Sequence, residues 1–211
     1  TLLPQEGSYL TILNTGGASQ ASIETFLGLN EGALDQWAQQ DSDAPGYDSS
    51  DSDENGIPLS GDATSGSAAV IQIEVSAGDT ISFDWNFVAS DYMPFNDYAI
   101  VTINGQIYAE LSDVLALGNV QGDVTSTGWQ TFTYTATQDG VVTIGIADVD
   151  IGDEVVDSHL AIDNLKLGVS GDAGEAIALN IASNLVDTDG SENLSILIQN
   201  LPDGATLSAG E

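Results

Sequence analysis

Short segments in which apolar and polar residues alternate follow one another through most of the chain. A period of two places the apolar side chains on one face of an extended segment, which is the pattern of a half-buried strand. Turn-forming residues separate these segments at short intervals, so alternating strands and helices are not indicated. Strands are expected at 8–13, 69–75, 80–88, 98–103, 106–111, 129–135, 141–146 and 160–167.

Local signals between these segments refine the fold class. Asn104-Gly105 joins two expected strands and is a strong signal for a two-residue hairpin turn. Residues 20–28 carry apolar side chains at helical spacing behind Ser22, which predicts one short helix. Residues 41–66 are rich in Asp, Ser and Gly and are expected to form a long acidic loop. The sequence predicts an all-β protein, a jelly roll or related β-sandwich, with one short helix and this loop.

The amino-acid composition of the chain changes near Gly168, where Ser, Gly and Asp become frequent. The residues that follow offer only two or three strands, too few for a core of their own. We therefore expect a β-sandwich domain at 1–169 and, at 170–211, a linker with a partial β-sandwich segment that opens a further domain. The first residues, 1–5, contain no basic residue, so we expect no signal peptide in this segment.

The charge balance excludes several functions. The chain has 33 acidic residues and one Lys or Arg, a formal net charge of -32, and no Cys. Contact with nucleic-acid phosphates needs Lys and Arg, and disulfides or Cys-ligated metals need Cys, so these are excluded. No apolar run is long enough to span a membrane. Hydrophobic residues still make up 42%, which is enough for a folded core.

A folded chain with this charge needs something to offset its self-repulsion. High ionic strength and bound divalent cations are the two candidates. The acids are mostly Asp, 23 against 10 Glu, and a short carboxylate in a turn suits a hard cation such as Ca²⁺. Asp also favours turns for its own reasons, so a salt-adapted, solvated surface stays open as the alternative.

The first candidate metal site lies in the long acidic loop. Asp51, Asp53 and Asn55 precede Gly56, and Asp62 stands twelve positions from the start, which is the spacing of a calcium-binding loop. The closing residue is Asp where Glu is usual, and no helices flank the loop. A solvated acidic loop is the alternative.

The second candidate metal site lies before the last expected strand. Between Asp148 and Asp163 six of sixteen residues are acidic. So many carboxylates between two strands are costly unless a cation neutralises them. A loop of solvated, repelling acids is the alternative. The metal candidates here are Asp148, Asp150, Asp153, Asp157 and Asp163.

The third candidate site combines acids with aromatic residues after the strand at 80–88. Carboxylates next to aromatic rings suit a ligand-binding groove. An ordinary strand with core aromatics and a polar turn fits equally well. The residues concerned are Asp91, Tyr92, Phe95, Asn96 and Asp97.

A fourth, weaker signal lies in the tail. Asp187, Asp189 and Glu192 form an oxygen-rich turn that can hold calcium at a domain junction. The alternative is an ordinary polar turn.

Catalysis finds little support in the sequence. The single histidine, His159, follows Asp157 and Ser158 directly. Neighbouring residues in a strand point to opposite faces, so this trio does not form a nucleophilic relay. No pair of carboxylates is singled out for glycoside hydrolysis. We expect that the protein is not an enzyme.

Three segments resemble a known family. SFDWNFVASDYMPFNDYAIVTING (82–105) and DVDIGDEVVDSHLAIDNLKL (148–167) look like ligand-binding modules near the C-terminal end of giant bacterial RTX adhesins. The tail at 175–211 resembles the start of the cadherin-like or split repeats of the same proteins. The loop at 41–66 matches nothing in this family.

The resemblance implies type I secretion, an extracellular location at the cell surface and folding on meeting extracellular calcium. Some modules of this family bind peptides through a calcium ion that holds the terminal carboxylate, and others bind sugars. Motif matching places Asn96, Asp97, Asp148, Asp150, Asp153 and Asp157 near the calcium and ligand site, and Asp163 at a structural site. The ligand-binding candidates are Asp91, Tyr92, Phe95, Asn96, Asp97 and Asp153.

The expected function is therefore calcium-dependent binding of a peptide, or of a protein on a host or partner cell, for attachment. The neighbouring domains of the same chain are further expected partners; nucleic acid and membrane insertion are not. A calcium-dependent carbohydrate-binding module is the first alternative, with Trp37 and Trp129 available to stack on sugar rings. A structural extender without a ligand is the second alternative.

Overall fold

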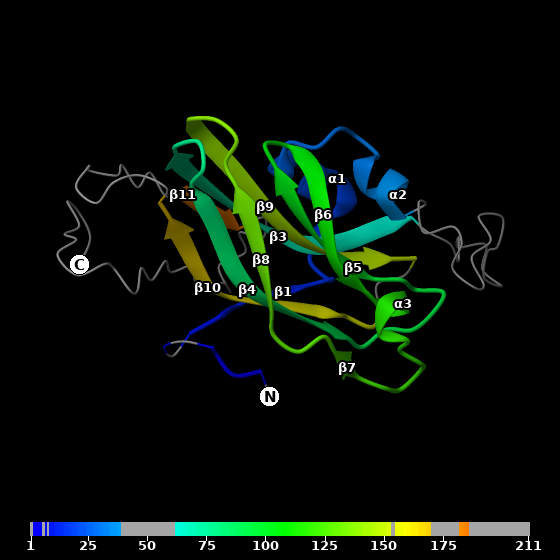
Figure 1. The fold of residues 1–211 in the computed structure, drawn as a ribbon. Helices are drawn as coiled ribbons and strands as arrows, with labels where there is room; N and C mark the ends of the chain where they lie inside the picture. Colours follow the sequence, from blue (N-terminus) through cyan, green and yellow to red (C-terminus); the bar gives the residue numbers. More distant parts are fainter. Residues whose placement is uncertain are drawn as a thin grey trace.

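Two antiparallel sheets pack face to face in the computed structural model (Figure 1), which describes residues 2–5, 7, 9–38, 62–152, 155–169 and the backbone of 182–185. Within these residues the chain is an all-β sandwich, as the alternating pattern predicts. Sheet A contains β1 (Thr11–Asn14), β10 (His159–Gly168), β4 (Thr80–Ala89) and β7 (Thr125–Ser126), and β8 (Gln130–Thr135) also pairs with β4. Sheet B contains β11 (Ala182–Leu185), β3 (Ala63–Val75), β9 (Gly140–Ile151), β5 (Tyr98–Ile103) and β6 (Gln106–Asp113), and β2 (Ala18–Ser19) also pairs with β3.

Three short helices accompany the sheets in the described part of the chain, so the expectation of one helix is wrong. α1 (Gln20–Leu27) follows the prediction, whereas α2 (Ala33–Ala38) and α3 (Val114–Leu117) were not expected. Both are too short to show a helical period in the sequence. α3 is set instead by its ends: Asp113 accepts a hydrogen bond from the Ala116 backbone N–H, and Gly118 closes the helix in the left-handed conformation.

The core has two layers because both faces of sheet B are buried. On β9, Ile144 and Ile146 face the interior of the sandwich, while Val149 and Ile151 face the helices α1 and α2. Strands covered on both faces bury consecutive residues, as β9 does from Ile144 to Ile151. β9 is therefore the central strand around which the site described below is built.

Two strands are longer than the sequence predicts. β3 begins at Ala63, so the prediction of a loop through residue 66 is wrong for its last four residues. β9 continues to Ile151, so Asp148 and Asp150 lie in a strand and not in a loop between strands. The hairpin turn is confirmed, with Asn104 and Gly105 at positive φ of 51° and 76°.

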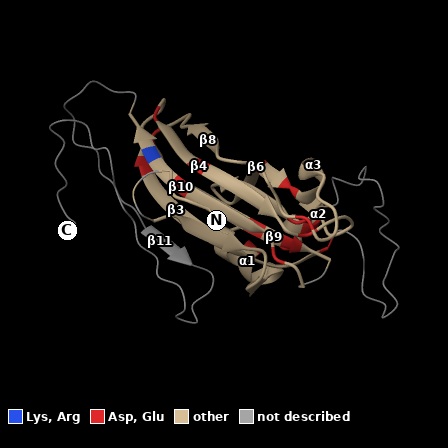
Figure 2. Cartoon of the chain, turned by 90° about the horizontal axis from the view of Figure 1, so that it is seen from below, with Lys and Arg blue, Asp and Glu red and all other residues tan. Residues whose placement is uncertain are grey.

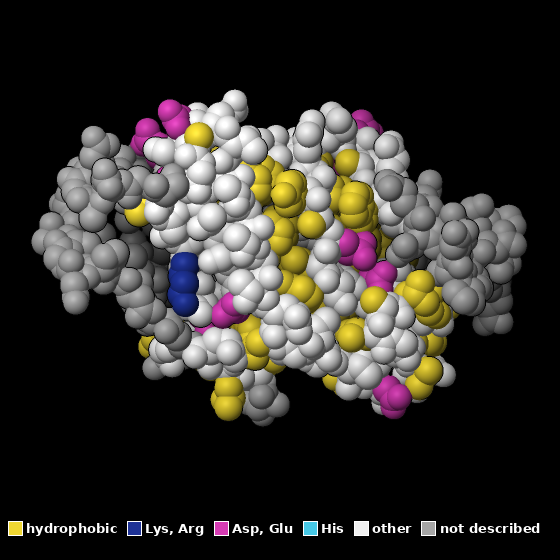
Figure 3. Space-filling view, in the orientation of Figure 1, with side chains coloured by type: hydrophobic (Ala, Val, Ile, Leu, Met, Phe, Trp, Pro, Cys, Tyr) yellow, Lys and Arg dark blue, Asp and Glu magenta, His cyan; other side chains and the backbone are white. Residues whose placement is uncertain are grey.

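A bulge on β6 closes one edge of the sandwich. Tyr108 has no partner in the register with β5 and directs its ring to Phe132 and Tyr134 on β8, with both ring pairs edge to face. Apolar side chains reach the surface along this seam between β8 and β6 (Figure 3). The bulge lets an edge strand of sheet B contact an edge strand of sheet A.

Of the tail at 170–211, the structure describes only β11, which pairs with β3 from Ala69 to Gln72. The division into a domain at 1–169 and a partial domain at 170–211 stays a prediction. None of the helices in the described ranges has the length and apolar character that a membrane crossing requires. Acidic residues gather at the end of the sandwich where β9 ends near α2 and α3 (Figure 2).

Candidate metal centre

At one end of the sandwich, the side chains that point from several strands into the interior carry oxygen atoms. On β9 the inward row runs through Ile144 and Ile146 to Asp148 and Asp150, because alternate residues of a strand share a face. The pairing of Ala99 with Asp148 brings Asp97, just before β5, beside Asp150. At this end of the sandwich, the inward-facing positions of the strands therefore carry carboxylates in place of apolar side chains.

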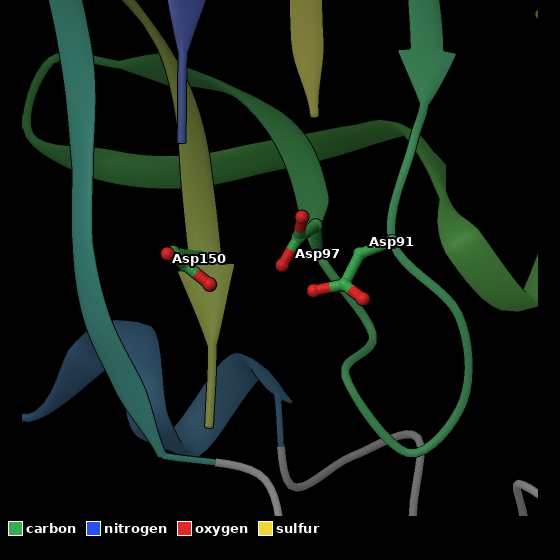
Figure 4. A group of neighbouring side chains, drawn as sticks. All are labelled: Asp91, Asp97 and Asp150. Atoms are coloured by element: carbon green, nitrogen blue, oxygen red, sulfur yellow. The ribbon is translucent and has the colours of Figure 1, made fainter. Parts of the chain in front are cut away.

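Three of these carboxylates converge. Asp91 follows β4, Asp97 precedes β5 and Asp150 lies on β9, and their side chains point toward one another (Figure 4). Their exposed fractions are 1%, 0% and 0%. One oxygen from each lies within 4.8 Å of the others, so this buried cluster can hold a metal ion.

Asp148 lies inward of the cluster and is completely buried. Neither of its carboxylate oxygens has a hydrogen bond of good geometry among the described residues. Burying a carboxylate in this way is costly unless a proton or a cation compensates it. Asp148 therefore points independently to a positive partner at this end of the sandwich.

Hydroxyl groups from three further segments, on β3, just after β1 and just before β10, lie around the carboxylates. Ser158 Oγ donates to Asp97 Oδ2 at 2.7 Å, and the Ile151 N–H donates to Asp97 Oδ1 at 3.1 Å. Ser65 Oγ lies 3.5 Å from Asp150 Oδ2, and Thr15 Oγ1 accepts from the Ser158 N–H at 3.0 Å. Ser65, Thr15 and Ser158 were not among the site residues predicted from the sequence. The only sign of them in the sequence was their position, where the inward-facing residues of a strand come to an end.

Burial controls the protonation of the acids. The pKa of Asp97 is raised to about 7, mainly by burial and to a smaller extent by the charge of Asp91, although hydrogen bonds from Ser158 and Ile151 oppose the rise. Burial also raises the pKa of Asp148 well above its usual range, with the charge of Asp97 as the next cause, and the Leu160 N–H offsets part of this rise. Without a cation, the centre holds protons or repelling charges near neutral pH.

The donor set selects the type of cation. Asp91, Asp97 and Asp150 offer carboxylate oxygens, and the neighbouring Ser65 and Ser158 offer hydroxyl oxygens. Oxygen ligands without nitrogen or sulfur suit hard cations such as Ca²⁺, Mg²⁺ and Mn²⁺. The arrangement can bind a cation that neutralises the carboxylates and coordinates an external ligand.

The loop between β4 and β5 flanks the cluster and carries both aromatic candidates. Tyr92 and Phe95 are half-buried and their rings meet edge to face, with centroids 5.7 Å apart. Phe95 packs on Gly152, where an added Cβ would lie 3.1 Å from the ring. The Tyr92 hydroxyl accepts a hydrogen bond from Gln121. The loop after β4 thus packs its aromatic side chain onto the turn that follows β9.

The structure does not bring every candidate to the cluster. Asn96 caps α3, because its Oδ1 accepts from the Leu115 N–H and its Nδ2 donates to Asp113. Asp163 on β10 accepts a hydrogen bond from the Gln5 N–H and lies in register with Asp84 on β4. It therefore lies in a part of sheet A away from the cluster.

Two more candidates lie at the rim of the cluster. Asp157 is exposed, yet its charge contributes to the raised pKa of Asp148. Asp62 is also exposed, and its backbone carbonyl accepts a hydrogen bond from the Gly152 N–H at 3.0 Å. The candidates outside the described residues are Asp51, Asp53, Asn55, Asp153, Asp187, Asp189 and Glu192.

Comparison with known proteins gives no match. No family model, no curated protein and no solved structure is significantly similar to this chain. Function is therefore inferred from the site itself.

Replacing one carboxylate of the cluster should have opposite effects without and with calcium. In metal-free protein at pH 8, Asp150→Asn should raise the free energy of unfolding by about 1–2 kcal/mol, because it removes one of several repelling buried charges. In saturating calcium the same variant should be less stable than the wild type, because a ligand is lost. Chemical denaturation in both conditions measures this.

The control for this variant is Asp123→Asn, which removes the same charge from an exposed position. It should change stability by no more than about 0.5 kcal/mol in either condition. If Asp150→Asn destabilises the metal-free protein as much as the calcium-loaded protein, the carboxylate serves only as a structural hydrogen-bond acceptor.

The stability of the metal-free protein should depend on pH with an unusual sign. The pKa of Asp97 is raised from 3.8 to about 7 on folding, so the folded state binds the proton more tightly than the unfolded state. This contribution is fully present below about pH 4 and is lost as the pH rises through about 7. The melting temperature of metal-free protein should therefore fall between pH 5 and pH 8, roughly the span of that shift. A rise over this interval would contradict the assignment.

Proposed function

We propose that this chain is a calcium-dependent ligand-binding module of a secreted bacterial surface adhesin. The carrying observation is the buried cluster of Asp91, Asp97 and Asp150, with Asp148 beside it. The resemblance of residues 82–105 and 148–167 to adhesin modules points the same way, because these two segments supply all four carboxylates.

Calcium is the cation that best fits this environment. Ca²⁺ accepts six to eight oxygen ligands in flexible geometry, whereas Mg²⁺ demands near-ideal octahedral positions. Carboxylates from three separate segments, with hydroxyl and backbone groups close by, suit the flexible case. A cation that binds only the folded state also stabilises it by mass action, which suits a chain with a net charge of -32.

The proposed ligand is a peptide whose terminal carboxylate coordinates the calcium. A surface with this net charge repels a free carboxylate unless a cation bridges the two. The half-buried rings of Tyr92 and Phe95 lie next to the cluster and offer apolar contacts for the last side chains of a peptide. Loops at one end of a rigid sandwich are common places for such sites.

Cellular context follows from the same proposal. A type I secreted adhesin passes from a compartment with little calcium to one with much, and the buried carboxylates would keep the domain loose until calcium arrives. Attachment to a peptide or protein on a host or partner cell is then the biological role.

A peptide library with free C-termini, compared with the same library amidated, tests this function. In millimolar calcium the free-carboxylate peptides should bind and their amidated counterparts should bind at least about tenfold more weakly, the loss expected for one charged contact. Asp91→Asn and removal of calcium should both abolish binding, whereas Asp123→Asn should not. Equal binding of free and amidated peptides would contradict the proposal that a terminal carboxylate is bound. Capture of sugars by the same loops would favour the carbohydrate alternative.

A further inference from the structure

A second concave site lies away from the metal centre, on the outer face of sheet B. It is a pocket of about 580 Å³ between the C-terminal end of α1 and the turn that joins β5 to β6. Asp97 precedes β5 and Asn104 follows it, so the strand separates the metal centre from the pocket by about 20 Å. The two sites do not share residues.

The walls of the pocket are two tight turns in contact. Gly28 ends α1 in the left-handed conformation, and Gly105 occupies the hairpin turn with φ of 76°. A Cβ on Gly105 would lie 2.7 Å from the Gly28 carbonyl oxygen, so only glycine allows this approach. The pocket is thus built from fixed backbone.

The described residues that line the pocket are uncharged, although the chain carries 33 acidic residues. Phe26, Leu27 and Val70 supply apolar surface, and the polar side chains that the pocket presents are amides and hydroxyls. Among these described lining residues an anionic ligand finds no cation, and it also meets the overall negative charge of the chain; a cationic ligand finds no carboxylate among them. The pocket therefore favours a neutral ligand with both polar and apolar faces.

Two amides offer a donor and an acceptor in fixed orientation. Asn104 Oδ1 accepts from the Thr143 N–H at 2.9 Å, which leaves the Asn104 Nδ2 group available as a donor. Gln72 Nε2 lies 3.4 Å from Thr143 Oγ1, which leaves the Gln72 Oε1 atom as an acceptor. Both amides contact Thr143 of β9, so one donor and one acceptor lie on either side of the same residue, an arrangement suited to the hydroxyls of a sugar ring.

We propose that this pocket binds a neutral pyranose ring of a glycan. The ring would place its C–H face against Phe26 and its hydroxyls on Gln72 and Asn104. The volume lies within the roughly 300–1,000 Å³ range of small-ligand pockets. This site is independent of the proposed peptide function and requires no cation.

Amide-resolved NMR with a panel of neutral monosaccharides and oligosaccharides, in saturating calcium, tests the pocket. The expected result is a set of shifts at Gly28, Gln72, Asn104 and Gly105, with no change at Tyr92 to Tyr98. Gln72→Met removes the acceptor, and Asn104→Asp removes the donor while it keeps the turn. Each should weaken binding about tenfold, a typical loss for one hydrogen bond in a binding site.

Gln106→Met is the matched control, because Gln106 is exposed beside the same turn but does not line the pocket. It should bind sugars as the wild type does. The absence of shifts at the pocket with every sugar of the panel would overturn the proposal. Sugar-induced shifts at Tyr92 to Tyr98 alone would also overturn it and would assign sugar binding to the metal centre. If peptides and not sugars shift the amide signals of the pocket residues, the proposal that the ligand is a sugar would be overturned.

Discussion

The constraint on which this structure depends is the neutralisation of four carboxylates inside one end of a β-sandwich. Like charges a few ångströms apart in a poorly solvated interior repel strongly, and each also loses its hydration. Asp91, Asp97 and Asp150 meet within 4.8 Å, and Asp148 is buried beside them. Protons would relieve this repulsion in mild acid, and a bound hard divalent cation would relieve it at neutral pH.

The same cluster connects the two sheets. Asp91 follows β4 of sheet A, whereas Asp148 and Asp150 lie on β9 of sheet B and Asp97 directly precedes β5 of the same sheet. Ser158, just before β10 of sheet A, donates to Asp97. A cation at this point would therefore cross-link segments that are far apart in the sequence. It would also fix the loop of Tyr92 and Phe95, so stability and ligand binding would respond together to calcium.

The sequence predicts the architecture well because alternation reports directly on which face of a strand is buried. It predicts the ends of strands poorly: Asp is a weak strand former, so the expected strand stopped at Ile146, although β9 continues through Asp148 and Asp150. The convergence of Asp91 with Asp150 depends on non-local pairing, which local patterns do not contain. Adjacent residues face opposite ways, so Asp97 enters the cluster while Asn96 caps α3.

Thermal unfolding of the metal-free protein, with calcium added in one arm and sodium chloride of equal ionic strength in the other, tests the central claim most directly. The account predicts a large rise in melting temperature with calcium that increases with the logarithm of its concentration, and a much smaller rise with sodium chloride. Equal stabilisation by both salts would contradict it, because the acids would then be screened as a solvated surface and not bound to a cation in the core.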